Sequence, residues 1–568
     1  MSPEERYKIT SGEYADFIIE GTKAVNTVAA DTAYSLQVIK NRYGVAYLPA
    51  SYMTMNSVYT MGYYTIPKLY GLLSYVSLES SGITQVRSEA GYDLYGDGVL
   101  IGFVDTGIDY TNTAFRNDDM TTRIVSIWDQ TIESDNYPKN FYYGTEYQRE
   151  EINKALQSKD PFSVVPSKDM IGHGTMLAGV AAGTNLEEAG FSGVAPNSEL
   201  VVVKLKEAKA YLKNFFLVPQ DALSFQSNDI MQGVDYLLQV AKSLNRPMVV
   251  CLGVGTNQGS HDGVSILDSY LQEVGDTVGI SVVAAAGNEG NLGHHYYGEI
   301  NPSREKEIIA LNVGENESGF SMELWGYVPN IVEVDIYSPQ FEFVAHIPQS
   351  LRPQETREVV FQDTTIYIDN NNSEPITGDQ LILMRFKNPS SGLWRLIVSG
   401  TGDLTTRYHI WLPMHGFITE ETYFFNANNQ TTLTSLGNTV NGITVTAYNP
   451  VNESLYYNSS RGYTKDNGLK PDVAAPGVNI KAPSFGNTMV RATGTGIAAA
   501  HAAGVAAMLL EWGIVRGNLP VMNNVIIRRM VVSGARRFSN IPFPNQDWGF
   551  GIIDIYRTFL LFTEEGTV

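Results

Sequence analysis

The sequence predicts an α/β protein built on a doubly wound parallel sheet, with a separate all-β unit inserted into it. Apolar runs typical of fully buried strands alternate with helical patterns over much of the chain. Between residues 297 and 431 the pattern changes to short alternating runs separated by Gly, Pro and Asn turns. The alternation of helix and strand resumes near residue 442. We therefore expect one α/β core domain whose sequence is interrupted by a β-sandwich.

Length and charge narrow the range of functions. At 568 residues the chain is too long for one ordinary domain. It has 39 Lys and Arg against 60 Asp and Glu, a formal net charge of −21, which argues against nucleic acid or an anionic membrane surface as a partner. No apolar run reaches the roughly 18 residues that a membrane span needs, and no signal segment opens the chain. The expected location is the cytoplasm at synthesis.

Several chemically tempting residues have simpler interpretations. Cys251 is the only cysteine, so an intrachain disulfide cannot form, and it is best explained as a small buried hydrophobe. His261 and Asp262 lie in a turn-rich stretch and are interpreted as part of a solvated loop rather than a metal or acid-base pair. We identify no cofactor motif and no metal-ligand set.

Two stretches carry candidate catalytic groups. The run from Val99 to Asp105 is apolar and ends in an acid, which is typical of a buried parallel strand with a carboxylate at its C-terminal end, where α/β sheets bind ligands. Asp109 falls in the following turn and is expected to stabilise that loop. His173 lies between two glycines at the start of an apolar helix, which favours a general base once it is paired with Asp105.

A third candidate stretch begins at Gly494 and leads into a helix that is expected to lie at the centre of the core. Gly494 and Gly496 allow a tight turn, and from Ile497 onward small and apolar residues predict a helix that is core on all sides. A helix N-terminus at such a turn exposes unpaired backbone N–H groups, which makes it a natural place to present a nucleophile. Here the presented residue is Gly496, which has no side chain.

Five blocks together resemble the motifs of the subtilisin-like serine proteases, the S8 peptidase family, and they occur in family order. The quoted blocks are Gly102-Phe-Val-Asp-Thr-Gly107, Gly172-His-Gly-Thr175, Ala284-Ala-Ala-Gly-Asn288, Lys470-Pro-Asp-Val-Ala-Ala-Pro-Gly477 and the Gly494–Gly504 stretch. The resemblance implies a subtilisin-like fold in which Asp105 and His173 belong to the catalytic triad and Asn288 is the oxyanion donor. It also implies that Leu252, Gly253, Val254 and Gly255 form the substrate-binding edge.

The resemblance also implies a division of the chain. Residues 1–82 are expected to form a prosegment-like α+β domain, 83–296 and 432–568 the two parts of the core, and 297–431 an inserted jelly-roll domain. The insertion resembles that of the Csp-type germination proteases of spore-forming Clostridia. Leu78–Ile83 is the candidate junction after the prosegment, with an ordinary N-terminal domain as the alternative. The implied partners are a peptide or protein in the substrate groove, the prosegment itself, or a germination-pathway protein, and the implied location is the spore.

The departure from the family pattern decides the functional alternatives. Where the family has its serine the chain has Gly496. Thr495 lies one residue before this position and Thr493 three residues before it, so neither is expected to replace the serine. One alternative is a pseudoprotease that binds or signals without cleaving peptides. The second is a working serine endopeptidase inactivated by a Ser-to-Gly substitution, and the third is a binding β-sandwich on a protease scaffold. We predict that Gly496→Ser would restore self-processing if Ile497 and its neighbours leave room for a Cβ atom.

Overall fold

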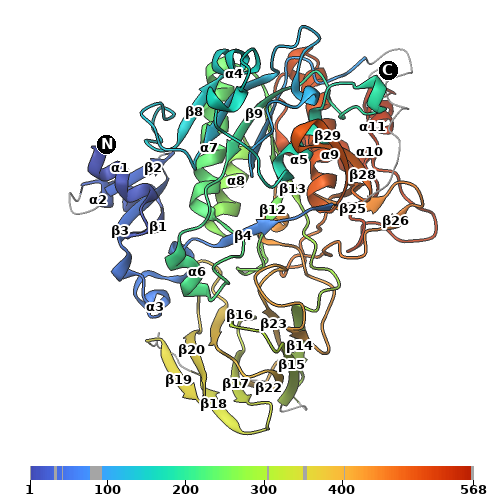
Figure 1. Cartoon of the computed structure of the whole chain (residues 1–568). Coiled ribbons are helices and arrows are strands. Elements are labelled where there is room, and N and C mark those ends of the chain that lie inside the picture. The colour runs from blue at the N-terminus through green and yellow to red at the C-terminus, as the bar shows by residue number, and fades with distance from the viewer. Residues whose placement is uncertain are drawn as a thin grey trace.

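The computed structural model describes residues 2–30, 35–40, 42–76, 93–302, 306–349, 355–401 and 403–564, which form three parts (Figure 1). An N-terminal domain is followed by an α/β core, and an antiparallel β unit lies below the core in Figure 1. We call the β unit, residues 295–424, the β insertion. The predicted Leu78–Ile83 junction lies outside the described residues.

The core is a mostly parallel sheet in the order β26-β25-β13-β11-β6-β9-β7-β8, with β27 also paired to β25. The central strands are buried at every residue, because helices cover both faces of the sheet. Figure 1 shows α7 and α8 on one side and α5 and α9 on the other. This arrangement confirms the predicted α/β fold. The strands are β6 (Leu100–Asp105), β7 (Ile124–Asp129), β8 (Thr145–Gln148), β9 (Glu199–Lys204), β11 (Met248–Leu252), β13 (Ile280–Ala285), β25 (Ile443–Asn449), β26 (Ser454–Leu455) and β27 (Val473–Pro476).

Helices and short strands complete the core. The helices are α4 (Arg149–Leu156), α5 (His173–Ala182), α6 (Ala210–Phe216), α7 (Ser227–Leu244), α8 (Ile266–Gly275), α9 (Thr495–Leu510), α10 (Asn524–Gly534) and α11 (Ile555–Glu564). The short strands outside the main sheet are β10 (Phe225–Gln226), β12 (Val254–Gly255), β28 (Ile480–Ser484) and β29 (Thr488–Thr493).

Helix α9 is buried along its whole length, as its lack of a polar face predicts. With the turn that follows, Thr495–Val515 is long and apolar enough to cross a membrane by length and composition, with a mean hydropathy of 1.5. The expectation that no run reaches that length is therefore wrong. Within the protein 89% of this window is buried, so the helix is the central core helix of the α/β domain.

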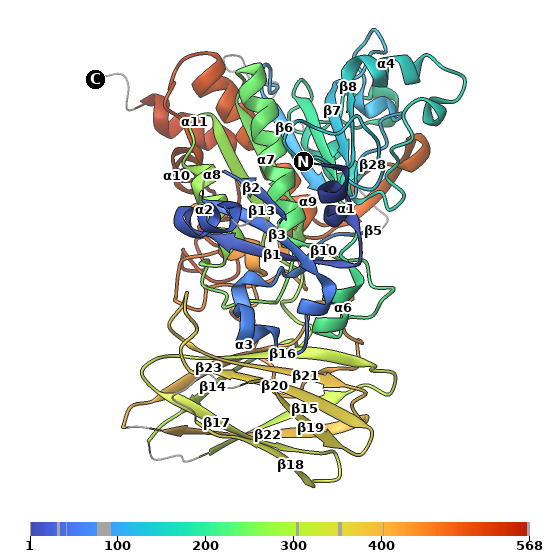
Figure 2. The same cartoon turned by 90° about the vertical axis from the view of Figure 1, so that its left-hand side faces the viewer.

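The N-terminal domain has a three-stranded sheet in the order β1-β3-β2 and continues into two short strands that leave the domain. Figure 2 shows the domain packed across the face of the core that carries α7. Its elements are α1 (Pro3–Thr10), β1 (Tyr14–Glu20), α2 (Thr22–Ala30), β2 (Ser35–Ile39), β3 (Tyr43–Pro49), α3 (Ser57–Met61), β4 (Leu69–Leu72) and β5 (Tyr75–Val76).

The β insertion consists of two antiparallel sheets, β14-β23-β16-β21-β20-β19 and β18-β17-β22-β15-β24, seen as two layers in Figure 2. The sheets bury an apolar cluster of their own between them. The strands are β14 (His295–Ile300), β15 (Lys306–Val313), β16 (Gly319–Gly326), β17 (Ile331–Tyr337), β18 (Phe343–Ile347), β19 (Arg357–Phe361), β20 (Thr364–Asn371), β21 (Gln380–Lys387), β22 (Gly392–Thr401), β23 (Thr406–Trp411) and β24 (Tyr423–Phe424).

Candidate active site

Asp105 and His173 meet at the C-terminal edge of the core sheet. Asp105 is the last residue of β6 and His173 the first of α5, whose N-cap Gly172 takes a φ of 84° that favours glycine. The Nδ1 atom of His173 lies 2.7 Å from Oδ1 of Asp105, and both residues are 1% exposed. The other ring nitrogen, Nε2, is buried and has no hydrogen-bond partner among the described residues. Asp105 therefore orients the imidazole so that its Nε2 atom can accept a proton from a nucleophile.

Asp169 supports this pair, although the sequence motifs did not single it out. Its Oδ1 accepts hydrogen bonds from the Thr106 hydroxyl at 2.9 Å and from the Gly172 N–H at 2.7 Å. Its Oδ2 accepts from the Thr175 hydroxyl at 2.7 Å. Asp169 thereby ties the loop after β6 to the first turn of α5 and fixes the distance between Asp105 and His173. The sequence signal that could have identified Asp169 is an acidic residue shortly before a helix start, where carboxylates accept hydrogen bonds from free backbone N–H groups.

Gly253 passes close to the pair and belongs to the predicted substrate-binding edge. A Cβ atom at this position would lie 3.1 Å from His173 Cε1 and 3.4 Å from Asp105 Oδ2, and it would overlap a Leu177 methyl group. Only glycine allows this approach of the backbone to the pair. Leu252 ends β11 just before it, and Val254 and Gly255 form β12 just after it. The four predicted edge residues therefore lie together next to His173.

Asn288 lies beside the start of α9. Its Oδ1 accepts two hydrogen bonds of 3.1 Å, from the backbone N–H and from the hydroxyl of Thr495. These bonds orient the amide, and its Nδ2 is buried without a hydrogen-bond partner in the part of the chain that the structure describes. A buried and unpaired N–H donor next to a helix N-terminus is suited to hold a developing oxyanion.

Neither neighbouring threonine replaces the missing alcohol. The Thr495 hydroxyl is engaged with Asn288 and also accepts from the Gly287 N–H at 3.0 Å. The Thr493 hydroxyl accepts from the Asn479 N–H at 3.0 Å, on the β28–β29 side of the site. Both hydroxyl groups are thus committed to structural hydrogen bonds. Gly496, in the first turn of α9, is the position that faces the site, and it offers only a backbone N–H.

The N-terminal domain extends a segment across this site, and we call residues 69–76 the crossing segment. On one side of the site β4 pairs antiparallel with both β10 and β12. On the other side β5 pairs antiparallel with β29. Figure 1 shows β4 running from the N-terminal domain toward the core. The crossing segment therefore binds as an added strand, the way extended peptides are held in many recognition sites.

Residues 73 and 74 of the crossing segment lie at the centre of the site. The Leu73 N–H donates to the Gly253 carbonyl at 3.1 Å, and the Leu73 carbonyl accepts from the Gly496 N–H at 3.1 Å. An ideal Cβ atom at Gly496 would lie 2.6 Å from Ser74 Oγ and 3.2 Å from the Leu73 carbonyl oxygen. Apart from the residues adjacent in sequence, the atom closest to a side chain at position 496 is therefore the Ser74 hydroxyl oxygen.

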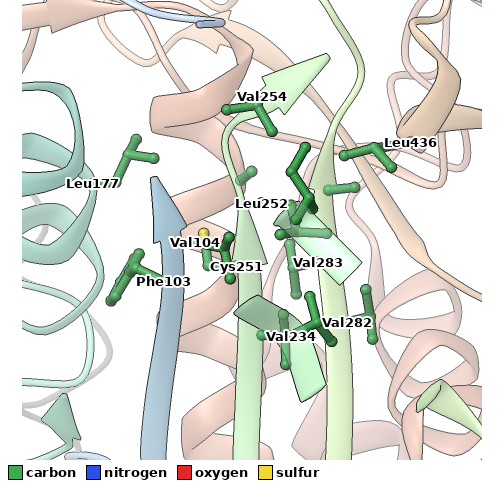
Figure 3. Close-up of a cluster of buried hydrophobic side chains, with 14 of the residues drawn as sticks. Phe103, Val104, Leu177, Val234, Cys251, Leu252, Val254, Val282, Val283 and Leu436 are labelled. Atoms are coloured by element: carbon green, nitrogen blue, oxygen red, sulfur yellow. The ribbon is translucent and has the colours of Figure 1, made fainter. Parts of the chain in front are cut away.

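The remaining candidates are structural. Asp109 is buried and accepts hydrogen bonds from Thr111 and from the Gly486 N–H, so it stabilises its loop. Figure 3 shows Cys251 within a cluster of buried apolar side chains, and this burial raises the pKa of its thiol. A thiol that stays protonated is a poor nucleophile.

His261 and Asp262 do not form a solvated loop, and that interpretation is wrong. Both residues are buried, and the His261 ring stacks on Trp411 of the β insertion with 4.0 Å between ring centroids. A sequence pattern of Gly, Asn and Ser around them is typical of exposed turns, but here a domain far along the chain covers the turn. The two residues therefore belong to the junction between the core and the β insertion.

Comparisons with known proteins agree with this geometry. The chain is similar to the Clostridium perfringens CspB protease structure, with 32% sequence identity and a TM-score of 0.75, over 84% of this chain and 95% of that chain. It is 24% identical to thermitase of Thermoactinomyces vulgaris over 267 residues, which are 47% of this chain and 71% of thermitase. It is 28% identical to the Arabidopsis thaliana subtilisin-like protease SBT2.2 over 219 residues, 36% of this chain, and the match spans only 24% of the plant protein's length.

The family match covers most of the chain. Residues 96–321 and 363–551 match the subtilase family, Peptidase S8. These two ranges contain Asp105, His173, Asn288 and Gly496, and they enclose part of the β insertion. The chain therefore belongs to the subtilase family of peptidases.

Proposed function

We propose that this chain is a catalytically inactive subtilase, a pseudoprotease that acts by binding or signalling. The observation that carries this proposal is Gly496. It lies where the family presents its serine, and its backbone N–H contacts a peptide carbonyl while no hydroxyl on α9 faces His173. Peptide hydrolysis by this machinery needs an alcohol whose proton the imidazole accepts.

The size of the expected loss supports inactivity. In subtilisin, loss of the serine lowers kcat by about 10⁶-fold and leaves about 10³–10⁴-fold acceleration over water, a measured example and not a value for this chain. A residue that is one position away on a helix points in another direction by about 100° and cannot substitute. On this scale the Asp105–His173 pair alone does not support biological proteolysis.

The occupied site indicates where a partner can bind. The crossing segment fills the place of a peptide substrate from the same chain, so a second protein does not have free access to the Gly253 and Gly496 backbone. We propose that the signalling partner binds elsewhere on the surface while the N-terminal domain stays attached. Following the resemblance to Csp-type germination proteases, we propose spore germination as the process, a germination-pathway protein as the partner, and the spore as the location.

A second function is favoured by one observation. The Asp105–His173 hydrogen bond of 2.7 Å and the oriented Asn288 are intact. A serine endopeptidase inactivated by a recent Ser-to-Gly substitution would have this geometry. In that case close relatives would hydrolyse peptide bonds, and this chain would be an inactivated member of that group.

Intact mass of the purified full chain tests the proposal. We expect one species near 62.6 kDa after expression and prolonged incubation, and no turnover of unstructured protein substrates. His173→Ala is the matched control, because it removes the imidazole that pairs with Asp105 and should also give a single uncut species. Two fragments that form spontaneously in the wild type, and that disappear with His173→Ala, would refute the pseudoprotease proposal.

A further inference from the structure

Ser74 lies where a side chain at position 496 would lie. Its hydroxyl oxygen is 2.6 Å from the ideal Cβ position of Gly496, closer than real Cβ contacts occur. Ser74 is 9% exposed, and its hydroxyl is buried without a hydrogen-bond partner among the residues that the structure describes. The space that the missing nucleophile would need is therefore filled, and it is filled by a hydroxyl from the N-terminal domain.

The backbone register fixes Ser74 in this place. Leu72 of β4 is paired with Val254 on one side, and Tyr75 of β5 is paired with Thr493 on the other. Between them the Leu73 N–H and carbonyl are both bonded to the core, to Gly253 and Gly496. With pairing on both sides, the segment cannot slip by one residue without breaking these bonds and turning its side chains over.

The same contacts single out one peptide bond. The Leu73 carbonyl oxygen accepts a hydrogen bond from the N–H at the start of α9, and the buried Nδ2 of Asn288 is available at that end of the helix. A carbonyl held by such donors is the one that is attacked in acyl transfer. The bond placed for cleavage is therefore Leu73–Ser74, which precedes the Leu78–Ile83 junction expected from the sequence.

We propose that Ser74 and Gly496 are a matched pair, in which the Ser74 hydroxyl replaces the missing side chain and closes the site, and that Leu73–Ser74 is the bond the site presents. This inference rests on the proposed function, because it explains how the inactive site stays occupied. It implies that a serine at position 496 fits without displacing residue 74 only when that residue lacks an Oγ atom. The site therefore favours a residue smaller than serine just after the presented bond.

The chemistry of a restored site follows from this geometry. A hydroxyl introduced at position 496 would attack the Leu73 carbonyl carbon, and His173 Nε2 would take its proton. Collapse of the tetrahedral intermediate breaks the bond to the residue 74 nitrogen, which receives that proton from His173. Water then hydrolyses the resulting ester and leaves a carboxylate on Leu73 and a free amine on residue 74.

A double-mutant cycle tests the steric pairing without relying on catalysis. We expect Gly496→Ala to lower the Tm of the full chain by roughly 1–3 °C, because overpacking of a close contact is destabilising. Ser74→Ala should change the Tm by much less, and the double variant should recover most of the loss. Equal Tm values for Gly496→Ala and the wild type, or strictly additive effects, would overturn the matched pair.

Cleavage tests the bond assignment. We expect the Ser74→Ala/Gly496→Ser variant to split into two fragments, with the new N-terminus at residue 74, and Gly496→Ser alone to split at least tenfold more slowly. Adding His173→Ala should abolish cleavage. A variant that shows the stability coupling but stays uncut, or is cut at another bond, overturns the assignment of Leu73–Ser74. Cleavage in the wild type would instead refute the proposed function, so the two failures are distinguishable.

Discussion

The ammonium group of Lys209 lies 2.6 Å from Oδ1 of Asp16, and this ion pair is buried between the core and the N-terminal domain. Asn228 donates a further hydrogen bond of 3.1 Å to Oδ2 of Asp16, and Lys209 donates to the Tyr14 carbonyl at 3.0 Å. Burial lowers the pKa of Lys209, and the Asp16 charge opposes that shift. Each of the two buried charges stabilises the ionised form of the other, and the pair holds the N-terminal domain against the core.

Removing one member of this pair should loosen the N-terminal domain. We expect Asp16→Ala to cost about 3–5 kcal/mol of unfolding free energy, because it leaves the buried Lys209 without its ion-pair partner. Thermal unfolding and limited proteolysis of the full chain measure the effect. Glu453→Gln is the matched control, since its pair with Arg536 is exposed and should contribute about 1 kcal/mol or less. Similar Tm values for both variants would show that the buried pair does not hold the domain.

A glycine in α5 should be intolerant of a single methyl group. Gly174→Ala would ordinarily favour a helix by about 1 kcal/mol, but its Cβ would overlap the backbone carbonyl oxygen of Gly107. We expect a net destabilisation of about 1–3 kcal/mol or more, measured by denaturant unfolding. Gly12→Ala is the control, because nothing lies within 4 Å of its Cβ position. A Gly174→Ala protein as stable as the wild type would contradict this packing.

His501, in the middle of α9, should make stability depend on pH. It is 7% exposed, its Nδ1 has no partner among the described residues, and burial lowers its pKa from 6.5 to about 4. As the pH falls below 6.5 the unfolded chain binds the proton first, so this residue lowers stability progressively until about pH 4. Below that pH both states are protonated and the loss is complete.

The variant that isolates this effect is His501→Gln, which does not titrate. Relative to the wild type, it should gain about 3 kcal/mol between pH 7.5 and pH 4, the amount that corresponds to the shift in the histidine pKa. Urea unfolding at several pH values measures the difference, and other titrating groups cancel in it. Parallel curves for the two proteins would show that His501 is not the titrating group.

Tyr63 should connect the N-terminal domain to the β insertion. Its hydroxyl donates to Oε1 of buried Glu323 at 2.6 Å, and its ring packs edge-on against Trp325. We expect Tyr63→Phe to cost about 1–3 kcal/mol, because Glu323 loses a buried donor. Exposed Tyr59 in the adjacent helix offers the control, and Tyr59→Phe should stay within about 0.5 kcal/mol. If the two variants unfold at the same temperature, this contact does not couple the domains.

Local patterns predicted much of the fold. The apolar run that ends at Asp105 became β6, and the alternating runs became strands such as β17, because burial of a strand depends mainly on its own side chains. Helix α9 is buried on all sides because its sequence offers no polar face to water. The order of the motifs likewise indicated that Asp105 and His173 would meet, and they do.

Contacts between distant segments decided the rest. The sequence could not show that His261 would be covered by Trp411, since a turn pattern looks the same whether or not another domain lies over it. It also could not show which residues of the N-terminal domain cross the site, because that register depends on pairing with β12 and β29.

The absence of a serine at position 496 was readable from the sequence alone, since a motif position is local. The tertiary structure decided what fills its place, because the Ser74 hydroxyl reaches Gly496 only through strand pairing on both sides of the site. Strand pairing is a non-local interaction, so the sequence around residue 74 does not predict it.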